Sequence, residues 1–149
     1  GHSNETTTWT DLTGNYNGKV TGATWSDEYL ELDGVDDWVN LGQISFTNAI
    51  TLEAIVKFNS ISANTQAILG NWNDGGLGIT MVESGYPRFI IYSAEQSAYI
   101  EAKSTTALSI GEKYHLIATY DGTTIEISEK EIVLSSTAAT FEFVAFIST

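Results

Sequence analysis

Cysteine is absent from this chain of 149 residues. Without a thiol there can be no disulfide, no thiolate zinc site and no cysteine nucleophile, although this absence does not decide the compartment. Basic residues are also scarce, with 6 Lys and Arg against 19 Asp and Glu and a formal net charge of -13. Nucleic acids and anionic lipid surfaces are bound mainly through Lys and Arg, so both should be repelled. Cations and neutral ligands such as sugars fit this charge better.

Long apolar runs are missing as well. None approaches the roughly 18 residues that a membrane-spanning helix needs, so we predict no membrane insertion. A hydrophobic content of 42% and a charged content of 17% exclude a disordered chain. The chain begins Gly1-His2-Ser3 without Met, which predicts a vector-derived or linker tail over residues 1–8. We predict a single domain over residues 9–149, cut from a larger parent with other domains.

Many segments of the sequence show the two-residue periodicity of β-strands. Apolar and polar residues alternate over Thr51–Phe58, with Ile55 as the exception, and the pattern recurs over Tyr114–Tyr120 and Thr123–Ile127, as in strands with one face on a core. Further short strands are predicted at Tyr29–Leu32, Trp38–Leu41, Ala67–Leu69, Leu77–Val82, Arg88–Tyr92, Ala98–Ala102, Glu131–Leu134 and Phe141–Ile147. Turn signals such as Asp33-Gly34 and Asp121-Gly122 separate them. About eleven short strands predict an all-β, two-sheet antiparallel sandwich.

Three segments carry a resemblance to a known family. Residues 9–14 read WTDLTG, residues 30–42 read LELDGVDDWVNLG and residues 114–122 read YHLIATYDG. In this order they resemble motifs of laminin-G-like, concanavalin A-like lectin/glucanase jelly-roll domains, in particular the bacterial-type laminin-G-like module. The resemblance implies a jelly roll with one convex and one concave sheet, an extracellular location, secreted or at the cell surface, and a role in binding sugars or proteins.

Two segments depart from the family pattern. Ser128-Glu129-Lys130-Glu131 stands where the family has a hairpin turn, and it lacks a residue suited to a tight primed turn. The apolar segment Phe141–Phe146 ends almost at the last residue, where the family has a further short segment. We therefore expect the domain to be truncated or atypical at its C-terminus.

Catalysis is not predicted. Glycosidases with this fold carry a Glu-x-Asp-x-x-Glu strand that sets two carboxylates on one face for retaining hydrolysis. The nearest match, Glu31-Leu32-Asp33-Gly34-Val35-Asp36, ends in Asp, and its glycine indicates a turn. His115 alternates out of phase with Tyr114 and Leu116 and is interpreted as a packed or surface structural histidine. No Ser-His-Asp arrangement can be assembled convincingly.

A calcium site is the first candidate for binding chemistry. Calcium takes six to eight oxygen ligands from carboxylates and carbonyls in loops. Asp33, Asp36 and Asp37 offer carboxylates at a strand end, and the family resemblance implies that a structural calcium is common in such domains. The alternative is that Asp33-Gly34 makes a turn and that the other two side chains are hydrated.

A sugar site is the second candidate. Asn71, Trp72, Asn73 and Asp74 combine an indole with amides and a carboxylate in one loop, the mixture that packs on sugar C–H surface and bonds its hydroxyls. The alternative is a polar loop whose Trp72 covers the sandwich edge. Tyr92 and Tyr99 could face the concave sheet or pack in the core. Trp9 and Trp38 are predicted to be core residues.

These observations support two functional hypotheses. The first is a non-catalytic extracellular recognition module that binds carbohydrate through a rim loop or the concave sheet face, with calcium as a structural ion. The second is a structural, protein-interaction or adhesion domain of a larger surface or phage fibre protein. The expected partner is accordingly a glycan or a cell-surface protein.

Overall fold

The computed structural model describes residues 7–26, 29–44, 49–71, 76–83, 85–93, 96–132 and 147–148. The fold is all-β, as the sequence predicted, and the described residues form no helix. Accordingly, that part of the chain holds no helical segment with the length and apolarity needed to cross a membrane. The chain divides into two compact units, the first mainly residues 1–45 and the second mainly residues from 46 onward.

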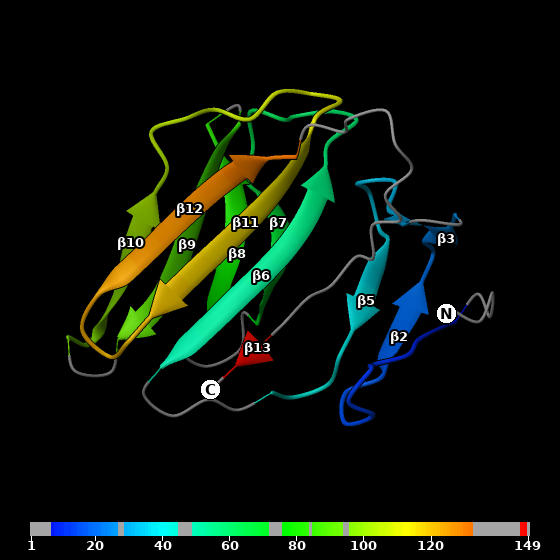
Figure 1. Cartoon of the computed structure of the whole chain (residues 1–149), viewed down its shortest axis with the longest axis horizontal. Coiled ribbons are helices and arrows are strands. Elements are labelled where there is room, and N and C mark those ends of the chain that lie inside the picture. The colour runs from blue at the N-terminus through cyan, green and yellow to red at the C-terminus, as the bar shows by residue number, and fades with distance from the viewer. Residues whose placement is uncertain are drawn as a thin grey trace. The chain divides into compact units, whose positions relative to one another are not determined.

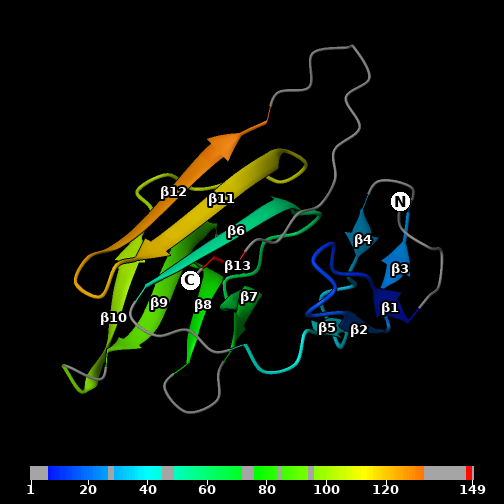
Figure 2. The same cartoon turned by 60° about the horizontal axis from the view of Figure 1, so that its bottom comes forward.

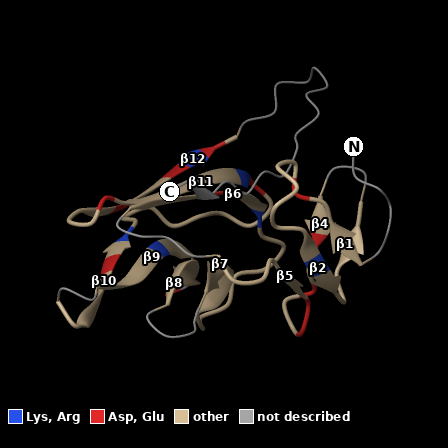
Figure 3. Ribbon diagram, turned by 90° about the horizontal axis from the view of Figure 1, so that it is seen from below, with Lys and Arg blue, Asp and Glu red and all other residues tan. Residues whose placement is uncertain are grey.

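The second unit is a sandwich of two antiparallel sheets. One sheet has the order β12-β11-β6-β13 and the other β10-β9-β8-β7. Figures 1 and 2 show β12, β11 and β6 crossing in front of β10, β9 and β8, and Figure 3 shows the two layers edge-on. The strands are β6 (Ile50–Lys57), β7 (Gln66–Asn71), β8 (Leu77–Val82), β9 (Tyr86–Ser93), β10 (Ala98–Lys103), β11 (Lys113–Tyr120), β12 (Ile125–Glu131) and β13 (Ile147–Ser148).

The core of this unit is formed by the inward faces of the two sheets. Leu52 on β6 and Leu116 on β11 come from one sheet, and Ile79 on β8 and Phe89 on β9 come from the other. Each of these side chains is almost completely buried. The alternation predicted for Thr51–Phe58 and Tyr114–Tyr120 is therefore confirmed, with β6 and β11 adjacent in the sheet.

One predicted boundary is wrong. The sequence predicted that one strand ends at Ile127 and that the next begins at Glu131. Instead, β12 continues through Ser128-Glu129-Lys130 and ends at Glu131. The pairing with β11 stays regular, with Glu129 opposite Leu116 and Glu131 opposite Tyr114. Glu129 alternates with Ile127 and so faces inward, where Ser104 Oγ donates a hydrogen bond of 2.8 Å to its carboxylate. The predicted strands Glu131–Leu134 and Phe141–Ile147 fall largely outside the described residues.

The first unit contains two small antiparallel sheets. One has the order β1-β2-β5, from Thr8–Trp9, Gly18–Thr21 and Trp38–Asn40, and the other pairs β3 (Thr24–Trp25) with β4 (Leu30–Glu31). The rings of Trp9 and Trp25 meet edge to face at 5.6 Å. Trp38 is not a core residue as predicted, because it is 49% exposed beside Thr21, on the face opposite Val20.

A hydrogen-bonded loop between β1 and β2 surrounds the carboxylate of Asp11. The Asp11 side chain accepts hydrogen bonds from the Thr13 hydroxyl and from the backbone N–H groups of Thr13, Asn15 and Tyr16. These donors stabilise the charged form and lower the pKa of Asp11 to about 2, with the Thr13 hydroxyl as the largest cause and the Tyr16 N–H next. The ionised carboxylate therefore shapes the loop.

We expect the stability that Asp11 contributes to depend on pH. Because its folded pKa lies below the unfolded value, the contribution is present above about pH 4 and is lost as the pH falls toward about 2. Asp11→Asn should therefore unfold at a lower temperature than the parent protein at pH 7, and this difference should shrink between pH 4 and pH 2. Thermal unfolding followed by circular dichroism measures it. An equal difference at pH 7 and pH 2 would show that the charge of Asp11 is not the cause.

Candidate functional site

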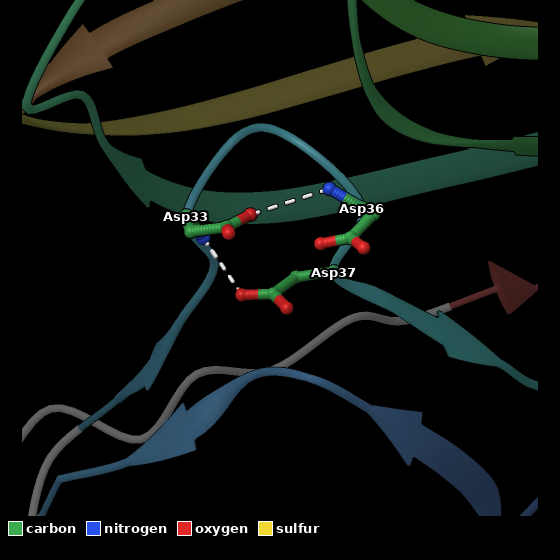
Figure 4. A group of neighbouring side chains, drawn as sticks. All are labelled: Asp33, Asp36 and Asp37. Atoms are coloured by element: carbon green, nitrogen blue, oxygen red, sulfur yellow. Dashed lines mark hydrogen bonds between the residues drawn. The ribbon is translucent and has the colours of Figure 1, made fainter.

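The predicted calcium ligands lie together in one tight loop of the first unit. The Asp33 N–H donates to Asp37 Oδ2 at 2.8 Å, and the Val35 N–H donates to Asp33 Oδ1 at 2.8 Å. A weaker bond of 3.3 Å joins the Asp36 N–H to Asp33 Oδ1. Figure 4 shows the resulting arrangement, with the side chains of Asp33, Asp36 and Asp37 gathered at the mouth of the loop.

The spacing of these carboxylates suits a calcium ion. One oxygen from each of Asp33, Asp36 and Asp37 lies within 4.8 Å of the others. Two oxygens bound to the same calcium ion at about 2.4 Å can be at most about 5 Å apart, so the three could share one ion. The loop bonds use Asp33 Oδ1 and Asp37 Oδ2, and each of these carboxylates has a second oxygen. The donor set therefore fits a hard cation, completed by water or backbone oxygens.

Gly22 is needed for the position of Asp37. It has a φ of +80°, a backbone conformation that side chains disfavour. A Cβ atom at this position would lie 1.8 Å from Asp37 Oδ1 and 2.9 Å from its Cγ. The absence of a side chain at residue 22 thus makes room for the carboxylate, and no motif in the sequence marks this glycine.

The structure separates the carboxylates that resembled a glycosidase strand. β4 ends at Glu31, and Gly34 has a φ of +77° in the turn that follows. Glu31, Asp33 and Asp36 therefore do not alternate along one strand face as paired catalytic carboxylates would. His115 lies on the outer face of β11, where its Nε2 is 3.1 Å from Glu53 Oε2 on β6. Both side chains are about 30% exposed.

The predicted sugar-binding tyrosines form one exposed pair. Tyr92 on β9 and Tyr99 on β10 are direct cross-strand partners. Their rings meet edge to face, with centroids 5.2 Å apart, and the residues are 36% and 53% exposed. Phe89 and Ile91 take the inward positions of β9, so both tyrosines lie on the outer face of the sheet. From the sequence alone, both core packing and surface exposure were possible for Tyr92 and Tyr99.

The ends of the predicted rim loop lie beside this pair. Asn71, the last residue of β7, pairs with Leu77, and Leu77 pairs with Ile91 next to Tyr92. The Tyr92 N–H also donates to the Gly76 carbonyl at 3.0 Å. Asn71 before the loop and Gly76 after it therefore both lie at the end of the sheet that carries Tyr92. Trp72, Asn73 and Asp74 lie outside the described residues.

Charged and hydroxyl groups continue the same outer face. Arg88 Nη1 lies 3.2 Å from Glu101 Oε2, and Arg88 Nε donates to Thr80 Oγ1 at 3.3 Å. Glu101 is two residues from Tyr99 and points to the same side of β10. Aromatic rings beside paired donors and acceptors are the combination that binds sugars in water. The alternation of residues along β9 and β10 could have predicted that Arg88 and Glu101 lie on this outer face. Only the pairing of the two strands shows that their side chains are in contact.

A lectin-like or adhesion module is the class of protein that the concanavalin A-like sandwich supports. A laminin-G family model, described as the concanavalin A-like lectin/glucanases superfamily, matches residues 33–128. The match covers more than half of the chain, so the chain belongs to this superfamily. Laminin-G-like domains of this type are generally non-catalytic binding modules. No curated protein matches the chain in sequence.

Proposed function

We propose that this chain is a non-catalytic extracellular recognition module that binds carbohydrate. The observation that carries the proposal is the exposed pair of Tyr92 and Tyr99 on the outer face of β9 and β10, next to the ends of the loop at residues 71–76. A sugar could pack its C–H surface on a tyrosine ring while Glu101, Arg88 and the amide of Asn71 bond its hydroxyls. The net charge of -13 favours neutral glycans over acidic ones.

The family supports this proposal at the level of class. Membership of the superfamily supports a lectin-like or adhesion module, and an extracellular location, secreted or cell-surface, is the setting in which such a module meets glycans. The turn after Glu31 argues against a retaining glycosidase strand. Binding alone is therefore the proposed activity, with a glycan or a glycosylated surface protein as the partner.

A glycan array followed by calorimetry tests the sugar site. For any glycan that binds, Tyr99→Ala should weaken the affinity by about tenfold, the loss expected when one aromatic contact is removed. Tyr99→Phe should bind nearly as well, because it keeps the ring. Tyr29→Ala is the matched control, since Tyr29 is 48% exposed and lies in the first unit. The proposal is wrong if no glycan binds, or if Tyr99→Ala binds as tightly as the parent protein.

We further propose that Asp33, Asp36 and Asp37 hold a calcium ion that stabilises their loop. Calcium should raise the unfolding temperature of the parent protein, since a ligand that binds only the folded state stabilises it by mass action. Asp36→Asn should reduce this increase, whereas Glu112→Gln, an exposed acid of the second unit, should not. Calorimetry with calcium after removal of bound ions by a chelator measures the affinity directly. Equal calcium responses in the two variants would contradict the assignment.

A further inference from the structure

The outer face of β9 and β10 carries a second aromatic group, at the end far from the tyrosine pair. Tyr86 begins β9, and because its neighbour Pro87 is fully buried, Tyr86 lies on the same outer face as Tyr92. The Nζ atom of Lys103, the last residue of β10, lies 5.1 Å from the centre of the Tyr86 ring. A ring beside an ammonium group offers a sugar both an apolar surface and hydrogen-bond donors.

Two rows of cross-strand pairs connect the two aromatic ends. Ile90 lies opposite Glu101, and Arg88 lies opposite Lys103. All four residues are partly or fully exposed. The outward residues of β9 from Tyr86 to Tyr92 and of β10 from Tyr99 to Lys103 therefore form one continuous surface, which we call the β9–β10 strip.

The β9–β10 strip is long and narrow. Tyr86 and Tyr92 are six residues apart along β9, a separation of about 20 Å in an antiparallel strand and several times the width of one sugar ring. The strip is only two strands wide, with about 5 Å between the strands. On its β8 side the outward residues are buried, since Thr80 is 0% and Val82 is 7% exposed. A ligand that contacts both aromatic ends must therefore be an extended chain that runs along the strands.

The charges of the β9–β10 strip are balanced, although the chain as a whole is strongly acidic. Arg88 forms an ion pair with Glu101, and Lys103 forms one with Glu83, so each cation has its own carboxylate. Figure 3 shows the basic and acidic segments of β9 and β10 side by side. Arg88 is also held by its bond to Thr80. Side chains that are held in place lose little entropy on binding, and their balanced charge suits an uncharged ligand.

We propose that the β9–β10 strip binds a linear, uncharged oligosaccharide that runs from the pair of Tyr92 and Tyr99 to Tyr86 and Lys103. This assignment rests on the proposed sugar-binding function and adds to it the class of glycan and a second contact at the far end. The tyrosine rings at the two ends pack on sugar C–H surface, and the charged side chains bond hydroxyl groups. Ile90 provides an apolar surface between the ends.

Calorimetry with oligosaccharides of graded length tests the assignment. The probes are cello-, malto-, manno- and N-acetylated chito-oligosaccharides, each series running from the disaccharide to the hexasaccharide. In a series that binds, the affinity should increase by about tenfold once the chain is long enough to reach Tyr86, which is the gain expected from one further aromatic contact. The affinity should then change little as the chain is lengthened further.

Substitutions at the far end of the strip locate the second contact. Tyr86→Ala should weaken hexasaccharide binding by about tenfold and leave disaccharide binding unchanged, whereas Tyr99→Ala should weaken both. Tyr86→Phe keeps the ring and should bind like the parent protein. Lys103→Ala, at an exposed site, should also weaken only hexasaccharide binding, and Lys130→Ala, an exposed lysine on β12, is its matched control. Circular dichroism confirms that each variant is folded.

A glycan array distinguishes failure of this assignment from failure of the sugar site itself. If no glycan binds, the proposed function is wrong and the assignment falls with it. If a glycan binds but no member of the four series does, the assignment is overturned and the proposed function stands. The same conclusion follows if disaccharide and hexasaccharide bind equally tightly, or if Tyr86→Ala and Lys103→Ala leave hexasaccharide binding unchanged.

Discussion

Phe89→Ala is expected to lower the free energy of unfolding by about 3–5 kcal/mol, the usual cost of removing a fully buried aromatic side chain. Phe89 is 0% exposed and lies in the middle of β9, between Ile79 on β8 and Ala102 on β10. Its ring belongs to the core cluster that joins the two sheets. The loss includes both the transfer of the ring from water and the cavity that it leaves, because a packed interior relaxes only partly.

Urea unfolding of the parent protein and the variant measures this cost. The urea concentration at the midpoint of unfolding should fall, while the slope of the unfolding free energy against urea concentration stays the same. This is the behaviour of a substitution that changes stability without changing the surface exposed on unfolding. Tyr92→Ala provides the comparison, because Tyr92 lies three residues further along β9 on the outer face and is 36% exposed. Equal losses in the two variants would mean that the inward face of β9 has been misassigned.

Gly22→Ala is expected to disturb the acidic loop although residue 22 lies outside it. The added Cβ would overlap Asp37 Oδ1, so the carboxylate must move and the hydrogen bond from the Asp33 N–H must break. A hydrogen bond to a charged group contributes about 1.5–3 kcal/mol. The positive φ of Gly22 adds about 1–2 kcal/mol for any L side chain. Both effects should lower the unfolding temperature, and calcium affinity should fall with them.

Gly42→Ala separates these two effects. Gly42 has a φ of +77°, close to that of Gly22, and no atom lies within 4 Å of the position that its Cβ would take. This variant should therefore show only the backbone cost and should keep any calcium response. If Gly42→Ala and Gly22→Ala lose the same stability and bind calcium equally, the contact with Asp37 does not hold the carboxylate in place.

The sequence predicted most strands because their periodicity comes directly from burial. Leu52 and Ala54 take alternate positions along β6, as Leu116 and Ala118 do along β11, and a sheet with one inward face requires that alternation. The continuation of β12 past Ser128 could not be predicted in this way. The family resemblance placed a hairpin turn at residues 128–131, whereas cross-strand pairing with β11 and the hydrogen bond from Ser104 to Glu129 extend the strand.

Residues close in the sequence were the easiest part of the candidate sites to find. Asp33, Asp36 and Asp37 are near one another because one short loop holds them, so their clustering follows from the chain itself. The pairing of Tyr92 with Tyr99 depends instead on the register of two strands, β9 and β10. A single sequence without its register does not contain that information.

The inward position of Glu129 also bears on how the protein avoids aggregation. β12 is the edge strand of its sheet among the described residues, and an open edge is a template on which another strand can add. An inward-pointing charge and a run of charged side chains make such addition unfavourable. The charged stretch at the end of β12 therefore protects this edge against the addition of another strand. It consists of Glu126, Glu129, Lys130 and Glu131, and it helps to keep a β-rich protein from forming fibrils.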